Sequence, residues 1–132
     1  MAVRAEGAGR LPPSSIVWEK AQGTADSSTP VCVNGLLFWI TDNGVMNCVD
    51  AATGRPHWQE RLTGDFKASP LAAEGRVYFL GLRGRCTVAA AAAEYRKLAE
   101  NRLDDEFVAS PAVSAGRLYL RGRKSLYCLG GR

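Results

Sequence analysis

The sequence predicts an all-β fold built from repeated four-stranded antiparallel sheets, and three observations carry this prediction. A proline that follows Ser or Thr recurs at intervals of 40 and 41 residues, at Pro30, Pro70 and Pro111. A glycine lies five residues after each proline, at Gly35, Gly75 and Gly116. A short apolar run follows each glycine, without the 3.6-residue period of a helical repeat. A period near forty with short strands is typical of propeller blades, so the sequence predicts a partial β-propeller with about three blades' worth of strands.

The repeats divide the chain into a lead-in and a series of blades. Residues 1–15 are rich in Ala, Gly, Pro and Ser and are predicted to be a disordered lead-in. The predicted repeats occupy 16–132. They comprise an outer strand and linker (16–27), a blade (28–64), a second blade (65–104) and an incomplete blade (105–132).

The first blade has the clearest strand pattern. Val31–Val33 and Leu36–Ile40 are two strands joined by Asn34-Gly35, the dipeptide that best tolerates the positive φ angles of a type I′ hairpin. Val45–Asp50 and residues 57–61 supply the third and fourth strands. We therefore expect a complete four-stranded blade.

The second and third blades depart from this pattern. Residues 87–103 are rich in Ala, Glu, Lys and Leu, which favours a helix on propensity alone. The repeat register favours strand, turn and strand, because a new Ser-Pro hairpin begins where the next blade should begin. We expect strands there, and only three strands in the last blade.

Trp18 aligns the start of the chain with the first blade. It precedes Trp58 by 40 residues, and the residues around the two tryptophans match. The chain is therefore predicted to begin with the fourth strand of a preceding blade.

The segment from Cys48 to Trp58 resembles the Asp-Ala-x-Thr-Gly-x-x-x-Trp signature of pyrroloquinoline-quinone-like (quinoprotein) propeller repeats. The matching positions are Asp50, Ala51, Thr53, Gly54 and Trp58. The resemblance implies that the aspartate and Thr-Gly shape the third turn and that the tryptophan packs between blades. The tail from Leu98 to Cys128 is similar to the closing repeats of the outer-membrane assembly lipoprotein (BamB-like) group. The second blade lacks the signature turn and its tryptophan.

The sequence contains no motif for catalysis, so we predict no catalytic, cofactor-binding or metal-binding residues. His57 is the only histidine, and no nucleophile elbow, phosphate loop or dinucleotide fingerprint is present. The four cysteines are widely spaced and are interpreted as buried reduced thiols. Cofactor-bearing relatives hold their quinone over calcium with a stacking tryptophan and, commonly, a disulfide between adjacent cysteines. This chain has no adjacent cysteines, and no Asn, Asp and Glu cluster is identified as a calcium site. A fragment of such a dehydrogenase is the alternative hypothesis.

The predicted function is a non-enzymatic interaction scaffold, a piece of a larger propeller. Its expected partners are a protein or peptide on the propeller face, and either the remaining blades of a longer chain or a second copy in a homodimer. The net charge of +4 gives no strong nucleic-acid signal, and no window is apolar enough for a membrane span. A candidate basic patch that could bind phosphate or anionic lipid comprises Arg117, Arg121, Arg123 and Lys124. The alternative interpretation is that these residues are solvated side chains at the rims of hairpins.

The sequence leaves the cellular compartment undecided. The first fifteen residues lack the apolar core of a signal peptide, so the chain as written predicts no export. The resemblance, in contrast, implies a family that is usually exported or periplasmic.

Overall fold

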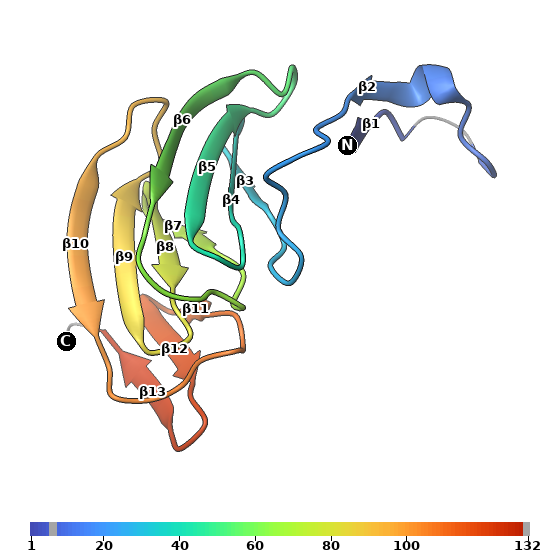
Figure 1. Ribbon diagram of the computed structural model, residues 1–132. Helices are drawn as coiled ribbons and strands as arrows, with labels where there is room; N and C mark the ends of the chain where they lie inside the picture. Colours follow the sequence, from blue (N-terminus) through green and yellow to red (C-terminus); the bar gives the residue numbers. More distant parts are fainter. Residues whose placement is uncertain (6–7, 131–132) are drawn as a thin grey trace.

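The computed structural model describes residues 1–5 and 8–130, and almost all regular structure in this part of the chain is β-strand (Figure 1). Residues 6–7 of the predicted lead-in and 131–132 of the predicted last blade lie outside the described residues. Two four-stranded sheets and one three-stranded sheet carry the repeats, and all their pairings are antiparallel. The predicted all-β partial propeller is confirmed.

Each sheet follows the chain in simple order, and we call the three sheets blades 1 to 3. Blade 1 comprises β3 (Val31–Val33), β4 (Leu36–Ile40), β5 (Val45–Asp50) and β6 (Pro56–Arg61). Blade 2 comprises β7 (Leu71–Ala73), β8 (Arg76–Leu80), β9 (Arg85–Ala90) and β10 (Lys97–Arg102). Blade 3 comprises β11 (Ala112–Ser114), β12 (Arg117–Arg121) and β13 (Leu126–Leu129).

Residues 87–103 form strand, turn and strand, as the repeat register predicts, and not a helix. β9 is buried along almost its whole length between the neighbouring strands and blades. Burial on both faces outweighs the helix propensity of alanine, because stacking the strand between neighbours removes its apolar surface from water.

The first hairpin of blade 1 has the left-handed turn residues that a type I′ hairpin requires, as predicted, and the hairpins of the other two blades share them. Asn34 and Gly35 have φ angles of 52° and 73°. The same left-handed pair recurs at Glu74-Gly75 and at Ala115-Gly116, with φ of 50° and 49° at Glu74 and Ala115. Glu and Ala adopt this conformation less readily than Asn, so the fold imposes it on these two positions.

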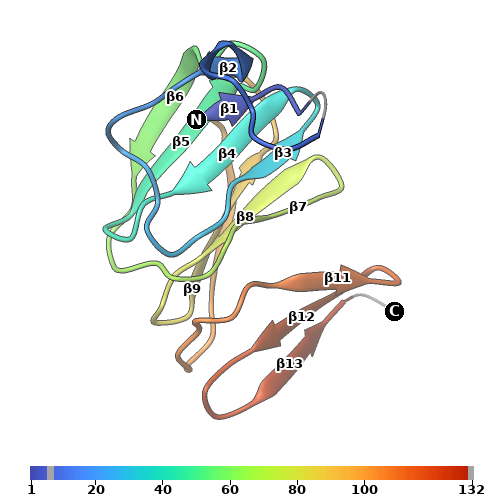
Figure 2. The same cartoon turned by 90° about the vertical axis from the view of Figure 1, so that its right-hand side faces the viewer.

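The core lies between the blades. One cluster joins blades 1 and 2 and includes Phe38, Met46 and Phe79, all fully buried. A second cluster joins blades 2 and 3 and includes Leu80, Phe107 and Leu120. Figures 1 and 2 show the three sheets following one another in chain order, each presenting a face to the next. Blade stacking, and not a closed barrel, therefore excludes water from the core.

The start of the chain differs from expectation. Residues 1–5 and 8–20, here called the N-terminal arm, were expected to be a disordered lead-in followed by a blade strand. Instead β1 (Ala2–Val3) pairs with β2 (Ile16–Trp18), after a single 3-10 turn at Pro13–Ser15. Backbone pairing between β1 and β2 joins the start of this arm to its last strand. Within the described residues, β2 pairs with β1 and with no blade strand.

Candidate interaction site

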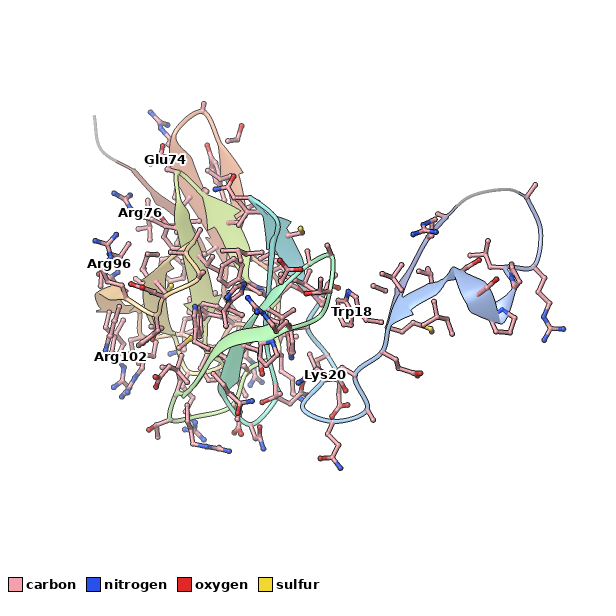
Figure 3. The ribbon with its side chains drawn as sticks, turned by 90° about the horizontal axis from the view of Figure 1, so that it is seen from above. Trp18, Lys20, Glu74, Arg76, Arg96 and Arg102 are labelled. Atoms are coloured by element: carbon pink, nitrogen blue, oxygen red, sulfur yellow. The ribbon has the colours of Figure 1, made fainter. Side chains whose placement is uncertain are left out.

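Two tryptophans make the same contact in successive repeats. The indole nitrogen of Trp18 donates a hydrogen bond to the carbonyl of Ala51 at 3.0 Å, and that of Trp58 donates to the carbonyl of Ala92 at 3.0 Å. Each tryptophan thus reaches from one strand to the third turn of the blade that follows. Figure 3 shows Trp18 where the N-terminal arm meets blade 1.

The signature residues of blade 1 form the turn that receives Trp18. The carboxylate of Asp50 accepts bonds from the backbone nitrogen and the hydroxyl of Thr53, both at 2.8 Å, and these bonds lower the pKa of Asp50. Gly54 has a φ of 71°, and a Cβ atom there would lie 2.6 Å from the indole of Trp18. Glycine is therefore required both by the backbone conformation and by the packed ring.

The third turn of blade 2 receives Trp58 through residues that differ from the signature residues of blade 1. It lacks the Asp-Ala-x-Thr-Gly sequence, and Tyr95 packs against Trp58 with ring centroids 5.1 Å apart. Burial raises the pKa of the Tyr95 hydroxyl, with Glu60 adding to the shift. Tyr95 could not be identified from the sequence, because its role depends on a tryptophan more than thirty residues earlier.

The residues before the repeated prolines link the blades along their inner strands. The backbone nitrogen of Thr29 donates to the hydroxyl of Ser69 at 2.8 Å, and that of Ser69 donates to the hydroxyl of Ser110 at 3.0 Å. The serine of each Ser-Pro motif therefore accepts a hydrogen bond from the backbone of the preceding blade. The spacing of the motifs alone did not reveal this role of the serine.

Two more carboxylates accept hydrogen bonds that hold loops in place. Asp42 lies in the turn between β4 and β5, and Asp105 lies in the connection between β10 and β11. Asp42 of blade 1 contacts Lys67 and Ser27, and these hydrogen bonds lower the pKa of Asp42 to about 2. Asp105 is buried, and burial by itself would raise its pKa. Hydrogen bonds from Glu106, Lys124, Ser125 and Tyr127 outweigh the burial, so the pKa of Asp105 is lowered.

The predicted basic residues do not form one patch. Arg117 and Arg121 bound opposite ends of β12, about 13 Å apart at the rise of a strand. Arg117 borders a cleft between the first hairpins of blades 2 and 3. Arg123 and Lys124 line a separate cleft of about 480 Å³ together with Arg83 and Arg102 from blade 2. Three acidic residues, at positions 104–106, line the same cleft. Sequence reasoning missed these last two arginines because they lie far from the C-terminal cluster in the chain.

The described residues offer little for catalysis. They contain no group of three or more His, Cys, Asp or Glu side chains placed to hold a metal ion. Burial raises the pKa of the Cys48 and Cys86 thiols to about 11, so both stay protonated near neutral pH. The four cysteines are free, but Cys32 and Cys128 are exposed, so the expectation that all four are buried is wrong. Both exposed cysteines lie on strands with a solvent-facing side.

No helix among the described residues has the length and apolar character needed to cross a membrane.

The blades and their tryptophan contacts define a partial β-propeller of the quinoprotein-like repeat class. The family described as outer membrane protein assembly factor BamB matches residues 11–99, about two thirds of the sequence, and the chain belongs to that family. No curated protein matches the sequence.

Solved structures show the same fold at low sequence identity. BamB from Moraxella catarrhalis is 21% identical with a TM-score of 0.64, over 76% of this chain and 32% of that one. A quinohemoprotein alcohol dehydrogenase from Pseudomonas putida HK5 is 19% identical with a TM-score of 0.60, over 71% of this chain and 16% of that one. The corresponding enzyme from Comamonas testosteroni is 20% identical with a TM-score of 0.59, over 74% of this chain and 17% of that one. This chain spans about a third of that BamB and about a sixth of each dehydrogenase.

Proposed function

We propose that the chain is a non-enzymatic segment of a larger propeller and serves as a protein-interaction scaffold. One observation carries the proposal: the ionisable groups with shifted pKa values are committed to structural contacts. Asp42, Asp50 and Asp105 accept hydrogen bonds that hold turns and connections in place. The buried thiols of Cys48 and Cys86 are protonated. A perturbed group that is used for folding is not poised for acid–base or nucleophilic chemistry.

The family supplies the class of partner. Its description names a factor in the assembly of outer-membrane proteins, and fold alone does not name a partner. We therefore propose that the chain contacts a protein of outer-membrane assembly through the turns and clefts between its blades. The remaining blades are supplied by a longer chain or by a second copy.

The likeness to quinohemoprotein alcohol dehydrogenases supports a second candidate, a fragment of a quinone-dependent dehydrogenase. A calcium-bound quinone needs a set of oxygen ligands. In the family that the sequence resembles, a disulfide between adjacent cysteines commonly accompanies it. The described residues contain no group of three or more His, Cys, Asp or Glu side chains placed to hold a metal ion, and their four cysteines are free and well separated in sequence. These two observations favour the scaffold over the dehydrogenase fragment.

Site-specific photo-cross-linking tests the scaffold proposal. A photoreactive phenylalanine analogue is placed at one exposed position at a time over the three blades, and the purified chain is irradiated in a bacterial envelope extract. We expect a discrete cross-linked protein from neighbouring positions on one face. Products spread evenly over all faces would contradict a specific scaffold. In parallel, quinone, calcium and an alcohol or aldose should give no dye reduction above a boiled control, and saturable reduction would establish the enzyme instead.

A further inference from the structure

A cleft lies where the connection that leaves blade 1 meets the second turn of blade 2. It encloses about 230 Å³. The connection between β6 and β7 contributes Thr63, Gly64 and Asp65 to its lining. Blade 2 contributes Gly81 and three arginines, which are Arg83, Arg85 and Arg102. The cleft therefore has three guanidinium groups and one carboxylate, that of Asp65.

The connection that leaves blade 2 meets blade 3 in the same register. At the earlier junction, the backbone nitrogen of Leu82 donates to the carbonyl of Asp65 at 2.8 Å. At the later junction, the backbone nitrogen of Arg123 donates to the carbonyl of Glu106 at 2.9 Å. Asp65 and Glu106 both lie five residues before the repeated proline. The two junctions can therefore be compared position by position.

A carboxylate fills the later junction. The oxygens of Asp105 accept hydrogen bonds from the backbone nitrogens of Lys124 at 3.1 Å and of Ser125 at 3.2 Å. Gly64 has the position of Asp105 in the earlier junction, because each lies six residues before its proline. Gly64 has a φ of 114°, which Asp105 does not share, and it has no side chain. Gly64 therefore offers no carboxylate to the second turn of blade 2.

The backbone of that turn has a donor without a partner. Arg83 corresponds to Lys124, because each directly follows the residue that donates to the connection. Among residues 1–5 and 8–130, the backbone N–H of Arg83 has no hydrogen-bond acceptor. A carboxylate placed as that of Asp105 is placed would accept this bond.

Blade 1 shows a second way to satisfy such a turn. The hydroxyl of Thr41 accepts a hydrogen bond from the backbone nitrogen of Val45 at 2.9 Å. Gly81 and Arg85 have these two positions in blade 2, eleven and fifteen residues after the proline. Gly81 has no hydroxyl to offer. The second turn of blade 2 therefore has neither the hydroxyl of blade 1 nor the carboxylate of blade 3.

The arginine side chains give the cleft an excess of positive charge. Arg85 and Arg102 lie directly opposite each other on β9 and β10, where like charges destabilise a sheet. Arg85 has an ion pair with Glu100 at 3.8 Å, and Arg83 and Arg102 have none with any acid in the described part of the chain. An anion in the cleft would reduce this repulsion and accept charge-assisted hydrogen bonds.

We propose that this cleft is a carboxylate-binding site. The bound carboxylate takes the place that Asp105 takes one junction later, accepts the backbone N–H of Arg83 and contacts the guanidinium groups of Arg83, Arg85 and Arg102. An Asp or Glu side chain of a protein segment or a small organic acid carries this group. The inference goes beyond the proposed function, because the site binds the same group from either source.

Titration followed by nuclear magnetic resonance of the 132-residue chain tests the proposal. The probes are sodium acetate and the end-blocked peptide Gly-Glu-Glu-Gly, with sodium chloride at equal ionic strength and the peptide Gly-Gln-Gln-Gly as controls. We expect both probes, and neither control, to shift the backbone amide resonance of Arg83 saturably. Binding of the peptide at least tenfold tighter than acetate identifies a protein segment as the source. Equal binding of the two identifies a small organic acid.

Substitutions in the chain locate the site. Arg83→Glu and Arg102→Glu should each weaken binding of acetate at least tenfold. Arg96→Glu is the matched control and should change binding less than twofold, because Arg96 precedes β10 whereas Arg102 ends it, about 20 Å away at the rise of a strand. Figure 3 shows both arginines at the same edge of the molecule. Gly81→Thr supplies the hydroxyl that blade 1 has and should weaken binding at least threefold, with its unfolding midpoint showing that it is folded.

Several results would overturn the proposal. They are no saturable shift of the Arg83 amide, the same shift with sodium chloride, and equal losses for Arg102→Glu and Arg96→Glu. Inorganic phosphate that binds at least tenfold tighter than acetate would overturn the assignment of the ligand as a carboxylate. If Gly81→Thr does not fold, the arginine variants decide the outcome. If a partner is cross-linked but the Arg83 amide does not respond, the scaffold function stands and the carboxylate site fails.

Discussion

Trp58 offers a direct test of the blade-to-blade contacts. The substitution Trp58→Ala removes the indole hydrogen bond to Ala92 and the ring contacts with Phe38 and Tyr95. A hydrogen bond of this kind contributes about 1 kcal/mol, and each aromatic contact contributes about 0.5–1.5 kcal/mol. Together they predict a loss of about 2–4 kcal/mol in the free energy of unfolding, within or just below the range for truncating a buried aromatic residue, since Trp58 is only partly buried.

Urea unfolding followed by far-ultraviolet circular dichroism measures this loss without depending on tryptophan fluorescence. Trp58→Phe keeps a ring but not the bond to Ala92, so it should cost about 1 kcal/mol. His57→Ala is the control from the adjacent position and should cost less than about 1 kcal/mol. A double substitution with Tyr95→Ala should cost less than the sum of the single losses, because the two rings share one contact. Equal midpoints for Trp58→Ala and His57→Ala would refute the packing between blades.

Four further outcomes are expected. Thr87 is fully buried and its hydroxyl has no hydrogen-bond partner among the described residues, so Thr87→Val should raise the free energy of unfolding by about 1–2 kcal/mol, and a lower urea midpoint would contradict this reasoning. Ala115 has a φ of 49°, so Ala115→Asn should stabilise the hairpin by about 0.5–1 kcal/mol in the same assay; a loss of stability would mean that asparagine cannot be accommodated there. The pKa of Asp42 is lowered to about 2 by Lys67 and Ser27 from an ordinary value of 3.8, so its contribution to stability is complete above pH 4 and is lost as the pH falls toward 2. Asp42→Asn should flatten the dependence of the thermal midpoint on pH in that window, and an unchanged dependence would exclude Asp42 as its source. Finally, β13 leaves Leu126 73% exposed at a sheet edge, so the chain as given should form a closed homodimer or an aggregating arc; a monodisperse monomer by light scattering at micromolar concentration would contradict both.

Much of the fold followed from local pattern. The dipeptide Asn34-Gly35 fixed the first hairpin, and the repeated Ser-Pro and glycine positions placed the same hairpin in the two later blades. The strand bounds of blade 1 agree closely with expectation, because a strand alternates faces every two residues and ends at turn residues that the sequence shows. Even 87–103, where propensity pointed to a helix, was assigned by register.

The contacts between blades were harder to predict from the sequence than the strands. Asp50, Thr53 and Gly54 were recognised from the repeat signature, yet the partner that requires Gly54, the ring of Trp18, is visible only in the folded chain. Tyr95 occupies an unremarkable position in the sequence, and its contact with Trp58 exists only because two blades stack. Contacts of this kind join residues from different repeats, and a single sequence contains no record of them.

The sequence by itself determined the repeat, the order of the strands and the type of the first hairpin of blade 1, since all three depend on residues within a few positions of one another. Tertiary structure alone decided which surfaces meet. It brought Arg83 and Arg102 of blade 2 beside Arg123 and Lys124 of blade 3. It also showed that Ala99 stands where Trp58 stands one blade earlier. The physical reason is that strand pairing is set by local alternation and turns, whereas packing between blades depends on side chains about forty residues apart.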